Sequence, residues 1–207
     1  MNRVASSLAF AFVLLLSLYV ATVSLRYALP EPEIPPNVGA NAFSDPVLLF
    51  HAITASVALL IGPLQFFRHK SGRRAWWHRI TGPIYALACL ASAPGGLLLA
   101  IGTTAGPVAA TGFGLLAVVW SWTTARGVQA VLAGRYAEHG RWMVRSFACT
   151  FAAVVLRLYL PLCFKLGVDM GFAYVSIAWL CWIPNLIVAE LILMAGRAKP
   201  AAAPQAA

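Results

Sequence analysis

His51, His78 and His139 are residues of this 207-residue chain whose side chains could do chemistry. A neutral imidazole can bind a metal, and histidine is also the side chain whose charge changes near neutral pH. Each of the three begins a row of polar or small residues spaced three or four apart, which places the members of a row on one helix face. The rows therefore predict three helix faces that carry polar groups.

The members of each row are mostly small or carry hydroxyl groups. The rows are His51, Ala55, Ala58, Gly62 and Gln65; His78, Gly82, Tyr85, Cys89 and Ser92; and His139, Met143, Ser146, Thr150, Ala153 and Arg157. Small residues let helices pack closely within a membrane, and hydroxyl groups can form hydrogen bonds between helices. Packing alone does not explain Arg157, because an arginine within a bilayer costs about 2.5–3.5 kcal/mol.

The composition indicates that these faces lie inside a membrane. Hydrophobic residues make up 61% of the chain and charged residues only 10%, whereas soluble domains carry about 25% charged residues. A membrane-spanning helix needs about 20 apolar residues. We place such helices at residues 5–25, 47–67, 80–102, 106–126, 142–164 and 172–195. The sequence therefore predicts an all-α, six-transmembrane-helix bundle.

The predicted organisation has four parts. They are a first transmembrane helix at residues 1–28, a proline-rich external loop at 29–46, a five-helix membrane core at 47–196 and a disordered tail at 197–207. The first apolar run is longer than the about 7–15 residues of a signal-peptide core, so we expect a retained helix. Prolines favour an extended loop without helix, and the Ala/Pro-rich composition of the tail favours disorder.

The distribution of charge predicts that both termini are cytoplasmic. Basic residues cluster in "RHKSGRRAWWHR" (residues 68–79), before the fifth helix and after the last helix, whereas the loop after the first helix is acidic. Cytoplasmic loops carry an excess of Lys and Arg, and six helices place all the basic segments on one side. We therefore attribute the net charge of +9 to the membrane surface. No nucleic-acid-binding motif is present, so no nucleic-acid partner is expected.

Positions along the helices place the polar residues at two depths. At about 1.5 Å per residue, Gln65, His78 and His139 lie near the cytoplasmic side, and His51 and Arg157 lie toward the outer side. A b-type haem needs two imidazoles at one depth, so His78 and His139 are candidate iron ligands, with Gln65 as a further cofactor-binding candidate. His51 and Arg157 suit an anionic or carbonyl group, such as a haem propionate or a quinone.

Three segments together resemble a family of predicted bacterial membrane proteins known as domain of unknown function 2306. They are "FHAITASVALLIGPLQF", "HRITGPIY" and "HGRWMVRSFACTFAAVVLRLYLP", and the likeness spans residues 47–162. The resemblance implies a multi-pass protein, which we expect in the bacterial cytoplasmic (inner) membrane, and it implies no activity. It places eight residues at positions that match the family's polar pattern: His51, Gln65, His78, Tyr85, His139, Arg141, Trp142 and Arg157.

We expect a redox-linked component that binds haem b or a quinone, or an accessory component whose partners are lipid and other membrane subunits. Two alternatives stay open. A small-molecule or proton-coupled transporter could use His51, Arg157 and Glu190, and a purely structural or assembly subunit would need no ligand. The paired broken helices of many transporters are not evident, although Pro161 and Pro184 could interrupt helices. No hydrolase triad, phosphate loop or metalloprotease motif is present, so no enzyme activity is assigned.

The predicted topology can be tested with a reporter that is active only in the cytoplasm. A fusion after Lys199 is expected to be active, because the basic segments hold that terminus on the cytoplasmic side. A matched fusion after Asn41, in the external loop, is expected to be silent. An active loop fusion with a silent C-terminal fusion would show the opposite orientation.

Overall fold

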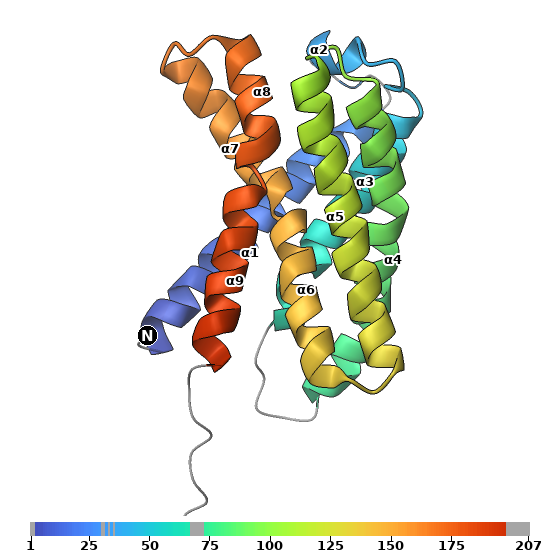
Figure 1. The fold of residues 1–207 in the computed structure, drawn as a ribbon, viewed down its shortest axis with the longest axis vertical. Helices are drawn as coiled ribbons and strands as arrows, with labels where there is room; N and C mark the ends of the chain where they lie inside the picture. The colour runs from blue at the N-terminus through green and yellow to red at the C-terminus, as the bar shows by residue number, and fades with distance from the viewer. Residues whose placement is uncertain (1–2, 30–31, 33, 35, 67–72, 198–207) are drawn as a thin grey trace, which may run out of the picture.

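In a computed structural model, the chain forms a bundle of helices that run back and forth along one axis (Figure 1). The structure describes residues 3–29, 32, 34, 36–66 and 73–197, and no strand occurs in these ranges. Six segments within them are long and apolar enough to cross a membrane: Ser7–Ala28, Val47–Phe66, Trp76–Ile101, Pro107–Leu132, Tyr136–Lys165 and Met170–Gly196. The predicted all-α, six-helix fold is confirmed.

Each span contains at least one α-helix, and two of the spans end in a short 3₁₀ turn. The described elements in chain order are α1 (Arg3–Ser24), η1 (Leu25–Ala28), α2 (Pro36–Gly39), α3 (Val47–Ile61), η2 (Pro63–Phe66), α4 (Arg73–Ile101), α5 (Pro107–Leu132), α6 (Tyr136–Thr150), α7 (Ala152–Lys165), α8 (Met170–Leu180) and α9 (Ile183–Arg197). The third and fourth spans are single helices, whereas two helices make up each of the last two spans.

Several predicted boundaries differ from the structure; α5 continues to Leu132 rather than to residue 126, and α6 begins at Tyr136 rather than at residue 142. α4 begins at Arg73 rather than at residue 80, so the later part of the basic run is helical. The helix extends beyond the apolar segment because charged side chains can reach the headgroup region, where hydropathy no longer marks a helix end. The segment predicted as an external loop contains the single turn α2, since Pro36 suits the first position of a helix. Residues 198–207 of the predicted tail lie outside the described residues.

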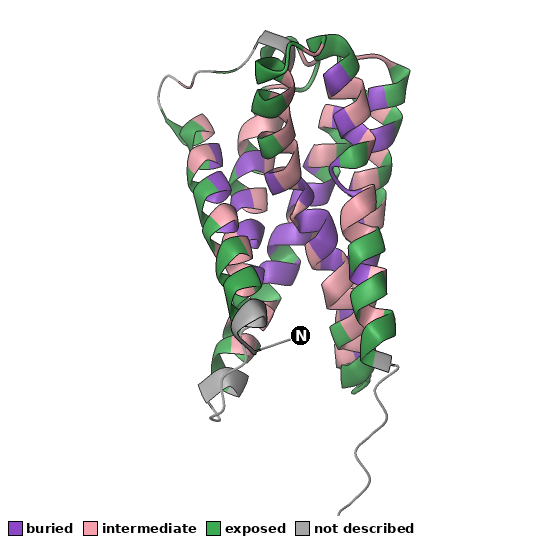
Figure 2. Cartoon of the chain, turned by 90° about the vertical axis from the view of Figure 1, so that its left-hand side faces the viewer, coloured by how far each residue is buried: buried purple, intermediate pink, exposed green. Residues whose placement is uncertain are grey.

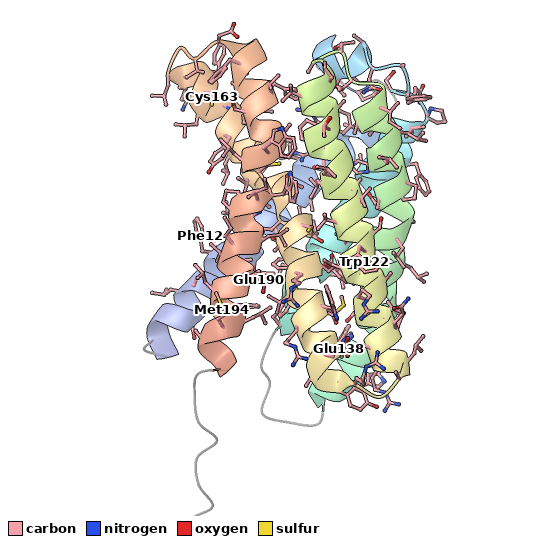
Figure 3. All side chains as sticks on the ribbon, viewed as in Figure 1. Phe12, Trp122, Glu138, Cys163, Glu190 and Met194 are labelled. Carbon is pink, nitrogen blue, oxygen red and sulfur yellow. The ribbon has the colours of Figure 1, made fainter. Side chains whose placement is uncertain are left out.

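The two ends of the bundle differ in charge. α4 and α6 begin, and α5 and α9 end, at one end of the bundle, which we call the basic end (Figure 1). Trp76 and Trp77 are exposed there, as expected for aromatic residues at a membrane interface. Figure 3 shows Glu138 at the basic end and Cys163 at the opposite end, which we call the far end. Arginines of the basic end include Arg79, Arg126, Arg135 and Arg141.

Buried residues gather in the middle of the bundle, and exposed residues cover its outer faces and its ends (Figure 2). α3, α4, α5 and α6 pack against one another in chain order, α1 packs against α3, and α8 packs against α5 and α7. The buried residues are mostly alanine, serine, threonine and cysteine, whereas many Leu, Ile, Phe and Trp side chains are exposed. This distribution matches a bundle surrounded by lipid, in which small residues allow close helix contacts.

The last two spans are interrupted near the middle of the bundle. The fifth span breaks at Phe151, between α6 and α7, and the sixth breaks at residues 181–182, between α8 and α9. Pro184 explains the second break, because proline has no N–H to donate to the Leu180 carbonyl. Pro161 lies inside α7 and does not cause the first break. The sequence had indicated Pro184 as a residue that could interrupt a helix, whereas it gave no sign of the interruption at Phe151.

Asn185 joins the two interrupted spans. Its Nδ2 donates to the Ala148 carbonyl of α6 at 3.2 Å and to the Cys181 carbonyl at 2.9 Å. Carbonyls in the last turn of a helix lack their regular helical donors. The amide therefore provides a donor to both breaks from one position at the start of α9.

Replacing Asn185 by leucine is expected to lower the melting temperature of the detergent-purified protein. Leucine has no donor, and leaving a buried acceptor without its bond costs about 1–3 kcal/mol. Val188→Leu introduces the same side chain at an exposed position of α9 and is the matched control. If both variants have the same melting temperature, Asn185 does not stabilise the breaks.

Candidate functional site

Three helices share a buried network of hydroxyl groups at the centre of the bundle. The Tyr85 hydroxyl of α4 lies 3.0 Å from Ser146 Oγ and 2.9 Å from Thr150 Oγ1, both on α6. From α5, Trp120 Nε1 donates to Thr150 Oγ1 at 2.9 Å, and Thr124 Oγ1 lies 2.7 Å from Ser146 Oγ. All five side chains are buried. We call them the hydroxyl network, and they confirm that the predicted polar faces of the third and fifth spans meet.

The contribution of α5 was missed at the sequence level. Trp120, Thr124 and Gly127 lie four and three residues apart and are all buried on one face of α5. The same spacing was used to find the three histidine rows, so the signal was present. It was overlooked because this face carries no histidine or charged residue.

His78 of α4 and His139 of α6 meet at the basic end, and we call them the histidine pair. Their ring centroids are 6.1 Å apart, and the ring planes are inclined by 74°. His139 Nδ1 lies 2.8 Å from the Gly127 carbonyl of α5. Because a carbonyl oxygen can only accept a hydrogen bond, His139 Nδ1 carries the proton and donates it. In the neutral imidazole, Nε2 is then the ring nitrogen without a proton. A Cβ at Gly127 would overlap the Met143 sulfur, so glycine permits this close approach of α5 and α6.

Two further side chains on this side of the hydroxyl network have a buried atom without a hydrogen-bond partner in the described part of the chain. The atoms are Gln65 Oε1 and Arg126 Nε. Gln65 Nε2 donates to Thr81 Oγ1 at 2.7 Å. Its Oε1 lies 3.6 Å from the point that a Cβ at Gly82 would occupy, one turn beyond His78. An unsatisfied acceptor therefore lies beside the helix face that carries His78.

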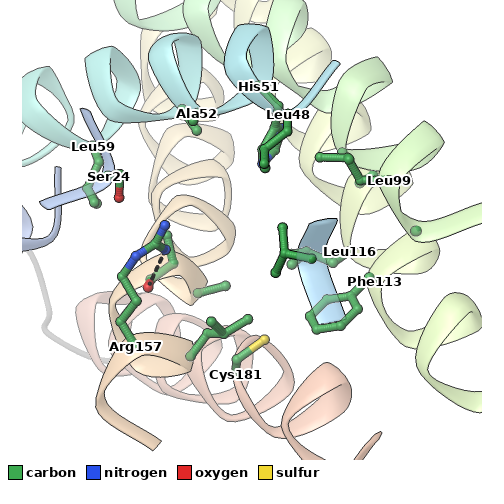
Figure 4. A pocket seen from close by; sticks show the side chains of 18 of the residues that line it. Ser24, Leu48, His51, Ala52, Leu59, Leu99, Phe113, Leu116, Arg157 and Cys181 are labelled. Atoms are coloured by element: carbon green, nitrogen blue, oxygen red, sulfur yellow. Dashed lines mark hydrogen bonds between the residues drawn. The ribbon is translucent and has the colours of Figure 1, made fainter. Parts of the chain in front are cut away.

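A cavity of about 370 Å³ lies in the other half of the bundle, between the first span and α3, α4, α5, α7 and α8 (Figure 4). We call it the far-end cavity. His51 and Arg157 both line it, as the sequence predicted for residues of one depth. Most of the other lining side chains are apolar, among them Leu48, Leu59, Leu99, Phe113 and Leu116.

His51 is held in place at the wall of the far-end cavity. Its Nδ1 donates to the Ser92 carbonyl at 2.9 Å, and Ser92 Oγ donates to the His51 carbonyl at 3.2 Å. A Cβ at Gly96 would lie only 3.0 Å from His51 Cε1, and one at Gly95 would lie 3.3 Å from His51 Cβ. Each mid-helix glycine costs about 1 kcal/mol relative to alanine. The two glycines therefore admit the imidazole at the expense of helix stability.

Arg157 brings a charge into the wall of the same cavity. Its Nη1 donates to the Ala153 carbonyl at 3.2 Å, shown as the dashed line in Figure 4. The ion pairs of the described residues do not include it. Arg145, by contrast, binds both carboxylate oxygens of Glu190, at 2.5 and 2.8 Å. Glu190 therefore does not neutralise Arg157.

The structure thus separates the predicted site residues into two groups. His78, His139 and Gln65 lie on the basic side of the hydroxyl network, whereas His51 and Arg157 line the far-end cavity. Within the described residues, no cluster of three or more His, Cys, Asp or Glu side chains could hold a metal ion. Of the predicted site histidines, His78 and His139 are the two that the structure brings together.

A double-mutant cycle tests the hydroxyl network. Tyr85→Phe and Ser146→Ala each remove one partner of the same bond, so their effects on the free energy of unfolding are expected to be non-additive by about 0.5–2 kcal/mol. Tyr85→Phe combined with Ser92→Ala is the control, because Ser92 bonds to His51 instead. Additive effects in both cycles would show that the Tyr85–Ser146 bond contributes nothing.

Comparison with known proteins supports the membrane assignment. A family described as predicted membrane protein, DUF2306, matches residues 48–193, which include the second to sixth spans almost completely. No curated protein and no solved structure matches the chain. The match and the six apolar helices together show a multi-pass protein whose spans lie in a lipid bilayer.

Proposed function

We propose, from the premise that the chain belongs to the DUF2306 family of predicted membrane proteins, that it is a redox-linked component of a bacterial cytoplasmic membrane. The cofactor would be haem b, with iron bound between His78 and His139. Other membrane subunits would be its electron donor or acceptor. The family description supplies the membrane location only, so the chemistry rests on the side chains of this chain.

The spacing of the histidine pair carries the proposal. The ring centroids are 6.1 Å apart, close enough that both imidazoles could hold one iron, since a metal–nitrogen bond is about 2 Å long.

The surroundings of the pair also fit a haem. Iron-binding histidines usually donate their other ring N–H to a carbonyl or carboxylate, which fixes the tautomer and the ring orientation. His139 has this bond to Gly127. Arg79 and Arg141 lie next to the pair in sequence, at the basic end, and guanidinium groups bind carboxylates such as haem propionates. Gln65, with its unsatisfied Oε1, would lie at the edge of the site.

A bound haem would exchange single electrons through its iron. His78 and His139 would hold the group, and the chain would supply its binding and orientation.

Transport of a small molecule is the second candidate function, and the interrupted spans favour it. Many transporters bind their substrates where discontinuous helices meet near the middle of the membrane. Cys149, Thr150 and Cys181, which lie at or next to the two breaks, line the far-end cavity. A ligand in this cavity would therefore contact both interrupted spans.

A visible absorption spectrum of the detergent-purified protein tests the haem proposal. Protein produced with ample haem is expected to show a stoichiometric Soret band and, after dithionite reduction, a sharp α-band. His78→Ala and His139→Ala are expected to lose these bands, because each removes one of the two residues that would hold the haem. His51→Ala and His69→Ala are the matched controls and should retain them.

Added imidazole separates a lost ligand from a misfolded variant, since it should restore the bands of His78→Ala and His139→Ala. A flat spectrum from well-folded wild-type protein would contradict the proposal. So would a haem spectrum that survives loss of both histidines.

A further inference from the structure

We infer that the far-end cavity binds an amphipathic anion, with its carboxylate or phosphate group on Arg157 and its apolar part against the leucines of the cavity wall. The cavity includes neither His78 nor His139. The inference is therefore independent of the haem proposal, and separate experiments test the two.

The unsatisfied charge of Arg157 is the first argument. Arg157 is partly buried, and a charged side chain within a membrane span normally faces the bundle interior and pairs with another group. Arg157 has no carboxylate partner among the described residues, and the Ala153 carbonyl accepts only one of its hydrogen bonds. A guanidinium group has five N–H donors. Donors therefore remain for a ligand at the cavity wall.

A second arginine makes the preference for an anion stronger. Arg26, from η1, also lines the cavity, and its like charge acts on Arg157. Its described contacts are with the neighbouring Tyr27, whose hydroxyl is 3.5 Å from Arg26 Nη2. None of the described lining residues is Asp or Glu. Arg26 is exposed, and its positive charge adds to the preference of the cavity for an anion over a cation.

The shape of the cavity requires an apolar part as well. Its lining extends from Arg26 at the far end to Trp120 and Thr150 of the hydroxyl network. Thr150 and Arg157 are seven residues apart, which corresponds to about 10 Å along a helix axis. Leu59 and Leu116 line the cavity as well, and Figure 4 shows their side chains around the same space as the Arg157 guanidinium group. An inorganic anion would leave this apolar wall without contacts, whereas an alkyl chain would cover it.

The volume agrees with such a ligand. Small-molecule pockets usually enclose about 300–1,000 Å³ and combine apolar walls with a few polar groups that fix the orientation. The far-end cavity has about 370 Å³, and its polar groups include Arg157 and His51. Since the Nδ1 of His51 is bonded to Ser92, Nε2 is the imidazole nitrogen left for a ligand contact.

Four probes with one alkyl chain and different headgroups test the inference. They are decanoate, decyl phosphate, decanol and decyltrimethylammonium, each added to the full-length protein in a non-ionic detergent. A ligand that binds only the folded state raises the melting temperature in a concentration-dependent manner. At least one anion is expected to do so, and comparison of the two anions distinguishes a carboxylate from a phosphate ligand. Equal shifts with decanol, or no shift with either anion, would overturn the inference.

Variants of two arginines locate the binding. Arg157→Leu is expected to weaken binding of the effective anion by about tenfold or more, because a charge-assisted hydrogen bond is lost. Arg157→Lys should retain part of the affinity, since the positive charge remains. Arg135→Leu is the matched control, because Arg135 pairs with Glu138 at the exposed basic end. Equal affinities of Arg157→Leu and Arg135→Leu would contradict the site.

Photocrosslinking of wild-type protein keeps the test decisive if Arg157→Leu does not fold. The probe is decanoate with a diazirine at the end of the alkyl chain. Crosslinks are expected at cavity residues such as Leu59, Leu116 and Trp120, and unlabelled decanoate should displace them. Crosslinks confined to exposed positions of α9, such as Ile187 and Leu191, would show lipid-like contact with the outer surface instead.

Discussion

The Thr150 hydroxyl on α6 lies 2.9 Å from the Tyr85 hydroxyl of α4 and 2.9 Å from the Trp120 Nε1 of α5. Hydrocarbon offers no competing hydrogen-bond partners, and apolar side chains gain little by leaving lipid for protein. Helix register in a membrane therefore depends on close packing and on polar contacts of this kind. In this bundle, one threonine connects three helices at a buried position.

Both candidate sites depend on that register. The histidine pair joins α4 to α6 on one side of the hydroxyl network, and Arg157 continues the same span beyond the network on the other side. A shift of α6 along α4 by one turn, about 5.4 Å, would separate His78 from His139. It would also displace the chain that leads into α7. The network thus links the geometry of two sites that share no residue.

Two arginines of the fifth span, Arg145 and Arg157, differ in their partners, and the difference suits one to stabilising the bundle and the other to binding a ligand. Arg145 holds Glu190 through two bonds and so connects α6 to α9. Arg157, three turns further along the same span, has only a carbonyl of its own helix as a described partner. A paired charge fixes neighbouring helices, whereas an unpaired one retains hydrogen-bond donors and an electrostatic preference for anions. The break at Phe151 lies between these two environments.

Local pattern was sufficient to predict the all-α fold, the number of spans and the faces that carry His51, His78 and His139. Hydropathy over about 20 residues reports insertion into a bilayer, and spacing of three and four reports a helix face. Both signals lie within one segment. Helix ends were predicted less well, as α4 shows at Arg73, because a helix can continue where its apolar run stops.

The sequence by itself determined which residues are polar, and it predicted two levels along the helices for them. Only the tertiary structure decided that His78 meets His139, that Asn185 bridges two broken spans and that Arg157 borders a cavity. These features depend on how helices distant in sequence cross and on which carbonyls a break leaves without donors. Residue spacing along one chain segment contains no information on the distance between two segments. That distance depends on how the helices pack, which only the tertiary structure shows.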